Sequence, residues 1–325
     1  MRKLTLISPC LIGILVLCAC ATTKPATDVQ VRPVLTNSSP APQQGFDVEI
    51  ALAEAQKLRL SSDYGASYDA YSVLFTHIRS QQVEDEIRTD ILLGLADSAL
   101  SLSWRAGTYE TRARELYNIV AKDEDSSKNH KTRAMSGTLL LDLASLKPNE
   151  AKEQLRLALE ASPDDPRLWN ALGKLHDSGA NWLDALDAYV QALTVAKQTG
   201  SSTAAVVNNM GMSLLMQGRK KESLAKFKQA YKANPDMPVY DNNLRLAQTL
   251  SGKTKAALKG LSDIRAAQIY NDAGVIAQAQ GKPSQARKFY KKAIQKSPVY
   301  FVVAEKNLAG LLVGTPPEKL EKSPA

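Results

Sequence analysis

Thiols are the side chains best suited to covalent or metal chemistry, and all of them lie near the start of the chain. The three cysteines are Cys10, Cys18 and Cys20. No disulfide or thiolate metal site can therefore form beyond residue 20. The histidines are far apart in the sequence and none has a partner at the i, i+4 spacing of a helical metal site. They are His77, His130 and His176.

Other motifs of catalysis are also missing from the sequence. Neither G-x-x-x-x-G-K-[ST] nor G-x-G-x-x-G is present, so no phosphate-binding loop is indicated. The acidic runs at 123–125 and 164–165 fall where helices are expected to begin or end, and capping with solvation explains them. We therefore expect no catalytic residue, metal or cofactor. An enzyme with a site between the N-terminal units is an alternative.

The composition is that of a folded helical protein. Hydrophobic residues make up 44% of the 325 residues and charged residues 23%, which argues against a disordered chain and against a multi-span membrane protein. The length allows about two domains or one long array. Aromatic residues are only 6%, while Ala, Leu and Lys are plentiful, which favours helices.

The first twenty residues have the pattern of a secretory signal. A basic start is followed by an apolar run over residues 4–17 that is short for a membrane span. The next residues, Leu17-Cys18-Ala19-Cys20, resemble the lipobox of bacterial lipoproteins. This resemblance implies a signal peptide over 1–19, cleavage before Cys20 and lipid attachment to its thiol. An ordinary cleaved signal or an uncleaved anchor is the alternative.

The resemblance also implies a location. Residue 21 is Ala and not the Asp that favours inner-membrane retention in such lipoproteins, so we expect an anchor in the outer membrane, facing the periplasm. Residues 20–46 are rich in Pro, Thr and Ser and show no apolar period, which predicts a disordered linker. About 26 flexible residues have a root-mean-square reach of roughly 28 Å. A disordered tail is expected at 314–325.

The body of the chain repeats a pattern of small and aromatic residues. Four segments align: 169–173 (Trp-Asn-Ala-Leu-Gly), 207–211 (Val-Asn-Asn-Met-Gly), 241–244 (Asp-Asn-Asn-Leu) and 270–274 (Tyr-Asn-Asp-Ala-Gly). Aromatic residues follow three of them, at Tyr189, Phe227 and Tyr290. This pattern resembles the tetratricopeptide repeat, a helix–turn–helix unit of about 34 residues. The resemblance implies an all-α solenoid, and a plain helical bundle is the alternative.

The repeat frames divide the chain into expected regions. Degenerate helical repeats are expected over 47–130, tetratricopeptide repeats over 131–300, and a helix over 301–313 that caps the last apolar face. The clearest frames are 166–199, 204–237, 238–266 and 267–300, of which the third is shortened. We expect four to seven units in total.

Asparagines recur at the fifth position of the clear frames, which in tetratricopeptide arrays usually faces the concave groove. Because a carboxamide offers both a donor and an acceptor, a row of them suits an extended peptide backbone, and Met side chains adapt to varied partners. The alternative is that these amides satisfy neighbouring groups and bind nothing. The candidate groove residues are Asn170, Asn208, Asn209, Asn242, Asn243, Asn271, Met212, Met216 and Leu246.

Basic residues exceed acidic ones, 41 to 33, and the excess lies late in the chain, at 219–232, 253–259 and 282–296. Nucleic acid is not expected as a partner of an exported chain. Anionic headgroups, peptidoglycan or an acidic protein are possible partners for this surface, and a solvated face is the alternative.

The lipobox, the linker and the repeats together resemble the assembly lipoproteins of bacterial envelope machines. Within that set, residues 206–211 and 270–275 look most like the tetratricopeptide lipoprotein of Flp (tight adherence, Tad) pilus assembly. This likeness implies a non-enzymatic, pilotin-like factor whose protein client is the secretin or another component of the pilus or secretion machine. An adaptor for peptidoglycan hydrolases is the alternative.

Overall fold

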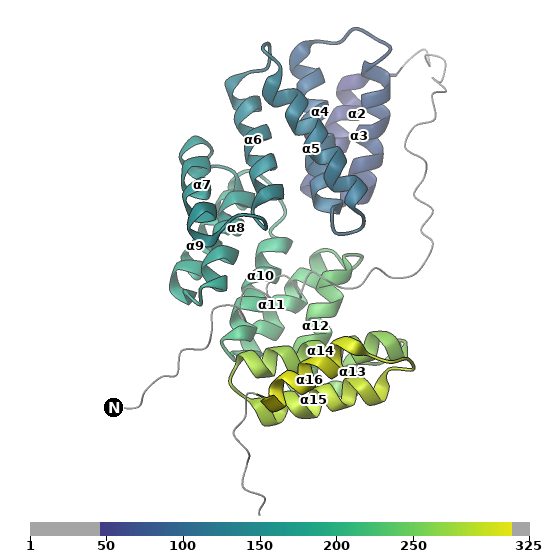
Figure 1. The fold of residues 1–325 in the computed structure, drawn as a ribbon. Coiled ribbons are helices and arrows are strands. Elements are labelled where there is room, and N and C mark those ends of the chain that lie inside the picture. Colours follow the sequence, from purple (N-terminus) through teal and green to yellow (C-terminus); the bar gives the residue numbers. More distant parts are fainter. Residues whose placement is uncertain (1–45, 314–325) are drawn as a thin grey trace, which may run out of the picture. The chain divides into compact units, whose positions relative to one another are not determined.

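The structure is a computed structural model that describes residues 46–313 (Figure 1). In that range the chain forms fifteen α-helices and no strand, which confirms the expected all-α fold. The predicted signal peptide, the lipid-attachment site Cys20 and the predicted C-terminal tail lie outside the described residues. No helix of the described part is long and apolar enough to cross a bilayer.

The described chain divides into two compact units, residues 46–206 and residues 207–313. The boundary falls inside helix α10 (Ala204–Met216). It does not coincide with residue 130, where the sequence pattern changes from degenerate to clear repeats, because compactness depends on helix packing and not on consensus residues.

The first unit contains four helix pairs. In order they are α2 (Val48–Leu60) with α3 (Tyr64–Ile78), α4 (Asp85–Leu102) with α5 (Gly107–Lys122), α6 (Lys128–Asp142) with α7 (Pro148–Ala161), and α8 (Pro166–Ser178) with α9 (Trp182–Gln198). The first helices of successive pairs also pack on one another, α2 on α4, α4 on α6 and α6 on α8. They form the inner layer of a solenoid, and the second helices form the outer layer.

The second unit continues the same arrangement. Its helices are the rest of α10, α11 (Lys220–Ala233), α12 (Pro238–Leu250), α13 (Thr254–Ala257), α14 (Asp263–Ala279), α15 (Pro283–Lys296) and α16 (Val302–Val313). Helix α12 packs on α14 and α14 on α16, as first helices do in the other unit. The single turn of α13 stands where a full second helix would be. Helix α16 also covers α15, the place expected of a capping helix.

Proline and polar residues set where the helices begin. Proline occupies the first turn of α7, α8, α12 and α15, where its missing N–H breaks no helical hydrogen bond. Five helices, α8 among them, begin at side-chain caps, which accept a hydrogen bond from a free N–H of the first turn. These caps are Asp47, Asp63, Ser127, Asp165 and Ser262.

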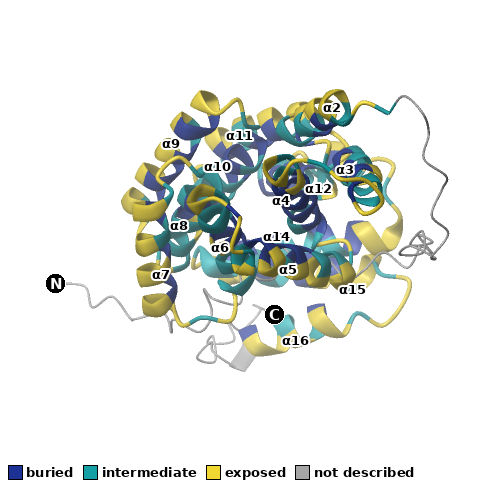
Figure 2. Ribbon diagram, turned by 90° about the horizontal axis from the view of Figure 1, so that it is seen from above, coloured by how far each residue is buried: buried dark blue, intermediate teal, exposed yellow. Residues whose placement is uncertain are grey.

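Within the pairs, a buried ring packs directly on a glycine of the neighbouring helix. A Cβ added to Gly274 would lie 2.5 Å from the ring of Tyr290, so no larger residue fits without moving the ring. The same contact joins Tyr189 to Gly173 and Phe227 to Gly211. All three rings are almost fully buried, and Figure 2 shows buried positions on the helix faces that meet neighbours.

The first three pairs of the first unit make this contact between pairs instead of within them. In the structure the nearest ring to Gly94 is Tyr71 of the preceding pair, and Tyr117 lies against Gly137 of the following pair. The reason is geometric, since the ring of a second helix reaches the first helices on both sides, and α4 packs against both α3 and α5.

Candidate functional site

The most buried helix of the first unit contains a carboxylate. Helix α4 packs against α2, α3, α5 and α6, and its residues from Ile91 to Ala99 are all buried. Asp97 lies in this stretch and is only 5% exposed. A carboxylate taken out of water is stable only if it is paired and hydrogen-bonded, so its partners define the site.

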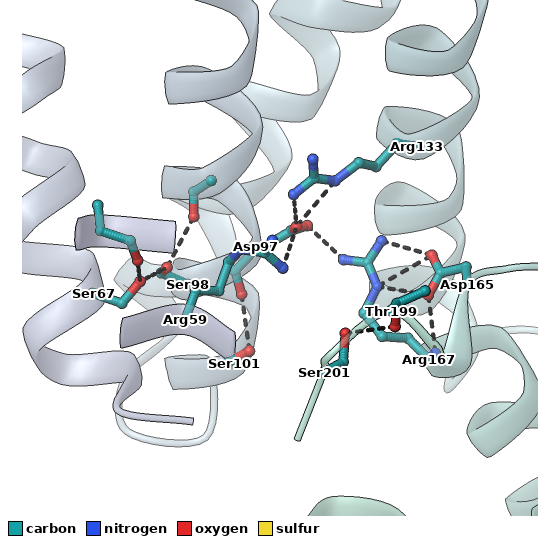
Figure 3. Close-up of polar contacts among 12 residues, drawn as sticks. Arg59, Ser67, Asp97, Ser98, Ser101, Arg133, Asp165, Arg167, Thr199 and Ser201 are labelled. Atoms are coloured by element: carbon teal, nitrogen blue, oxygen red, sulfur yellow. Dashed lines mark hydrogen bonds and ion pairs between the residues drawn. The ribbon is translucent and has the colours of Figure 1, made fainter. Parts of the chain in front are cut away.

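Four side chains converge on Asp97, and Figure 3 shows the three arginines among them. Arg133 Nη2 lies 2.5 Å from Asp97 Oδ2, and Arg167 Nη1 lies 2.5 Å from Oδ1. The hydroxyl of Tyr117 donates to Oδ1 over 2.6 Å. Arg59 Nη1 is farther away, 3.7 Å from Oδ2. We call these five residues the Asp97 cluster.

The Asp97 cluster joins all four inner helices of the first unit. Helices α2, α4, α6 and α8 each contribute one residue, in order Arg59, Asp97, Arg133 and Arg167. Arg167 is held from a second side, because its Nη2 lies 2.7 Å from Asp165 Oδ2 and Asp165 also caps α8. One carboxylate thus ties together the inner layer of the first unit.

The arginines keep the carboxylate charged. Burial alone would raise the pKa of Asp97, but Arg133, Arg167 and Arg59, with the hydrogen bond from Tyr117, hold it well below its ordinary value. Burial and the charge of Asp97 raise the pKa of Tyr117. The cluster is therefore a fixed set of charges at physiological pH and has no proton to transfer.

The Asp97 cluster forms part of the wall of a groove of about 510 Å³. The side chains of Arg59, Arg133 and Arg167 are a quarter to a third exposed, so their outer edges face this space. The rest of the wall is mostly short polar side chains and small apolar ones. They include Ser101, Asn129, Thr132, Ala161, Asn170 and Ser202. We call this space the inner groove.

The chemistry of the inner groove suits binding of a neutral polar chain. The three arginines are balanced by Asp90, Asp97, Asp164 and Asp165 in the same wall, so no large net charge selects an ion. Hydroxyl and amide groups supply both donors and acceptors. The volume is within the range of pockets that hold a drug-sized ligand, or a few residues of an extended peptide.

The candidate asparagines fall into two groups. Asn170 lines the inner groove in the first unit. In the second unit, Asn243 Nδ2 donates to Asn208 Oδ1 over 2.9 Å, and Asn208 donates to Asn209 over 3.3 Å. Asn208 and Asn243 are about 5% exposed, so this pair joins α10 to α12 and offers little surface to a partner.

A second amide pair repeats this arrangement. Asn307 Nδ2 donates to Asn271 Oδ1 over 3.0 Å, which joins α16 to α14. Asn242 accepts a hydrogen bond of 2.7 Å from Arg265 Nη2 and lies nearer the surface. Thus the amides of the second unit bond mainly to neighbouring helices.

The apolar candidates also take part in packing. Leu246 is buried in the core of the second unit, and Met212 and Met216 pack against that core while partly buried. They lie between helices and present only part of their surface to solvent.

Each histidine lies against a described side chain. His130 Nε2 lies 3.5 Å from Asp90, and His176 Nδ1 lies 3.7 Å from Asp184. The ring of His77 packs on Phe46, with ring centres 4.6 Å apart. No group of three His, Cys, Asp or Glu residues able to hold a metal occurs among residues 46–313.

The sequence pattern missed the Asp97 cluster. One signal was present, because Asp97 is the only charged residue in the apolar run from Ile91 to Leu102 and so required a partner. The arginines that pair with Asp97 could not be recognised from the sequence. Arg59 lies in the last turn of its helix, Arg133 in the second turn and Arg167 in the first turn of theirs, so the three share no repeat position.

Comparison with known families identifies the repeat. Two family models described as tetratricopeptide repeats match residues 178–238 and 267–299. The chain contains tetratricopeptide repeats. Together with the paired helices, this confirms the expected tetratricopeptide solenoid. None of the curated proteins compared matches the chain.

Several solved structures resemble the chain over most of its length. A tetratricopeptide repeat protein from Parabacteroides merdae is 15% identical, with a TM-score of 0.39, covering 82% of this chain and 98% of that one. The APC/C hetero-tetramer Cut9–Hcn1 is 12% identical, with a TM-score of 0.48, covering 83% and 57%. The apo quorum sensor NprR from B. thuringiensis is 16% identical, with a TM-score of 0.41, covering 82% and 71%.

Proposed function

We propose that the protein is a lipid-anchored scaffold on the periplasmic face of the outer membrane that captures a protein client during assembly of a pilus or secretion machine. The client would be a secretin or another component of that machine, as in a pilotin-like role in Flp (Tad) pilus assembly. Tetratricopeptide repeats support the coarser part, a scaffold for protein–protein interaction. The lipobox-like residues that end at Cys20 support the anchor.

The inner groove is the observation that carries the capture step. Its polar wall offers both donors and acceptors to an extended segment. The Asp97 cluster holds α2, α4, α6 and α8 in one arrangement before a client arrives, so little ordering is needed on binding. The tether adds a further advantage, because it raises the effective concentration of the groove near membrane clients.

The electrostatics of the groove support binding over catalysis. Asp97 is held ionised and its arginines are already paired, so the cluster contains no general acid or base poised near neutral pH.

A bulky substitution that fills part of the inner groove tests the capture step. Ala161 is exposed at the end of α7 and lines the groove, so Ala161→Trp should fill part of it without entering the core. Ala53 on α2 is also exposed but lies outside the lining, which makes Ala53→Trp the matched control. We expect the secretin to co-purify with the wild type and with Ala53→Trp, but not with Ala161→Trp.

Two other results would change the proposal. Equal recovery of the secretin with both tryptophan variants would remove the groove from the mechanism. Recovery of a peptidoglycan hydrolase in place of a secretin would favour the adaptor role.

The anchor is tested separately. Cys20→Ser should move the protein from the membrane fraction to the soluble fraction of the periplasm, because the acyl chains that hold it are gone. Retention of this variant in carbonate-washed outer membranes would show that another element anchors the chain.

A further inference from the structure

The two units differ sharply in charge. Residues 46–206 contain 17 Lys and Arg against 24 Asp and Glu, whereas residues 207–313 contain 18 against only 6. The second unit is therefore strongly cationic and the first is anionic. A charge imbalance of this size creates a long-range field that attracts anionic partners to the second unit.

Helix α15 contributes much of the excess. It contains five basic residues and no acidic residue. Lys288, Lys291 and Lys292 are exposed. Lys296 is the only lysine of this helix that forms an ion pair with another described residue, at 2.6 Å from Asp263. Lys292 lies over the ring of Tyr270, with its Nζ 5.6 Å from the ring centre. The charges of Lys288 and Lys291 are thus the ones most available to something outside the unit.

Exposed apolar side chains gather at one end of the same helix. Val299 and Tyr300, which follow α15, are 64% and 77% exposed. Val302 and Val303, at the start of α16, are 44% and 47% exposed. These four residues are consecutive but for Phe301, unlike the apolar residues scattered singly over ordinary surfaces.

A fifth residue joins this group from another helix. Ile264, at the start of α14, is 49% exposed, and the ion pair between Lys296 and Asp263 brings the start of α14 next to the end of α15. All the large apolar side chains exposed in the described part of the second unit are therefore at this end. Lys306 lies three and four residues after Val303 and Val302, on the same face of α16, and is exposed.

We propose that this α15–α16 surface, made of Lys288, Lys291, Lys292, Lys306, Ile264, Val299, Tyr300, Val302 and Val303, docks on a membrane that contains anionic phospholipid. Lysines near such a surface are attracted to its headgroups, and Tyr with short aliphatic side chains enters the interfacial region beneath them. The combination distinguishes a membrane from nucleic acid, whose bases stack on several aromatic rings, since only one ring is exposed here.

This docking is separate from the lipid on Cys20. A lipid at the end of a linker holds the protein near a membrane but does not orient its body. A second contact through the α15–α16 surface would do so, and membrane attachment by two weak signals is far stronger than by one.

The test uses the full chain with Cys20→Ser, so that no lipid is attached and any effect of residues 1–45 is common to all variants. Binding is measured by co-sedimentation with vesicles of phosphatidylcholine alone or with about one third phosphatidylglycerol. We expect binding to the anionic vesicles only, weakening as salt is added. A triple variant should bind the anionic vesicles about a hundredfold more weakly, roughly fivefold for each lysine. Its substitutions are Lys291→Gln, Lys292→Gln and Lys306→Gln.

The matched control removes equal charge from the other end of the unit. Lys221, Lys253 and Lys255 are exposed near the starts of α11 and α13. These starts lie beside the start of α15, because Lys220 Nζ donates to the carbonyl of Leu250 and a Cβ added to Gly218 would lie 4.0 Å from Lys282 Nζ. Helix α15 is about 21 Å long, which separates that end from Val299. Their triple Gln variant should keep most of the binding. The double variant Val299→Ser with Tyr300→Ser should bind anionic vesicles about tenfold more weakly, because it loses the apolar contact and keeps every charge.

Two results would overturn the proposal. One is equal vesicle binding by the two triple lysine variants, which would mean that binding depends on the net charge of the unit and not on the α15–α16 surface. The other is no preference for phosphatidylglycerol, including the case in which the second unit binds only an acidic protein or nucleic acid. A Cys20→Ser chain that still binds anionic vesicles supports the surface whether or not the lipid anchor exists.

Discussion

Arg167 Nη1 donates to Asp97 Oδ1 over 2.5 Å and so joins two residues that are seventy positions apart in the chain. Their helices, α8 and α4, do not pack on each other, because α6 lies between them in the inner layer. The bond therefore spans a whole repeat. It fixes how far the inner layer can open, and with it the width of the inner groove.

Removing the charge of Asp97 should destabilise the first unit. Asp97→Asn leaves Arg59, Arg133 and Arg167 without their shared anion, and we expect a loss of about 2–3 kcal/mol. This figure is below that for fully buried pairs because the arginines keep some contact with water. Urea unfolding followed by circular dichroism measures it. Asp164→Asn, an exposed change in the same groove wall, should have almost no effect.

Asp97 also predicts a pH dependence. Its pKa is lowered in the folded state, so the stabilisation is complete above the unfolded value of about 4 and is lost as the pH falls towards the folded value. The wild type should lose stability in acid more steeply than Asp97→Asn. Parallel acid curves for the two proteins would mean that the cluster contributes nothing through its charge.

The packing of Tyr290 on Gly274 predicts an asymmetry between two glycine substitutions. Gly274→Ala places a Cβ 2.5 Å from the ring, and we expect a loss of about 1–3 kcal/mol from overpacking. Gly310 is also helical but has nothing within 4 Å of the added atom, so Gly310→Ala should stabilise α16 by up to about 1 kcal/mol. Thermal unfolding of both variants checks the pair, and similar melting temperatures would contradict it.

The Asn208 and Asn243 pair predicts a structural cost at positions that the sequence assigns to a groove. Asn208→Ala leaves the buried amide of Asn243 without its acceptor, and we expect a loss of about 1–2 kcal/mol. Asn242→Ala removes only a contact with Arg265 near the surface and should cost about 0.5 kcal/mol or less. Client binding by each variant should be compared at a temperature where both are folded. Equal stabilities would show that the amide pair is not an important contact.

The sequence predicted the repeat architecture well because its determinants are local. A glycine such as Gly274, a ring sixteen residues later and a proline at a helix start each act within one helix pair. Their spacing survives in a single sequence, so the repeat frames over 166–300 could be drawn from it. The ring contacts of α3 and α5 were harder to predict, because Tyr71 meets Gly94 across a pair boundary that the repeat pattern does not encode.

The Asp97 cluster could not be predicted because its determinants are distant. Arg59, Arg133 and Arg167 lie on three different helices at three different positions, and only the stacking of the inner layer brings them to Asp97. The amide pairs show that a sequence period does not fix which way a side chain points. The period placed Asn208 and Asn242 in one row, but the rotation of α12 turns its other asparagine, Asn243, towards Asn208.

Asp272 predicts a second pH effect, opposite in sign to that of Asp97. Burial raises its pKa to about 6, with a smaller opposing effect from the hydrogen bond that Asn271 Nδ2 donates over 3.3 Å. In the unfolded chain the same group titrates near 4. Between these two values the folded state holds more protons than the unfolded state, so the free energy of unfolding falls as the pH rises from about 4 to 6.

Asp272→Asn should remove the fall in the free energy of unfolding between about pH 4 and 6. Two earlier repeats have Asn at the matching position, Asn209 and Asn243, so the amide fits the fold. We expect the variant to be about 3 kcal/mol more stable than the wild type near pH 7 and equal to it below about pH 4, where the wild-type carboxyl is neutral. Urea unfolding of both proteins across this range measures the difference. A difference that does not change with pH would exclude titration of Asp272 as its cause.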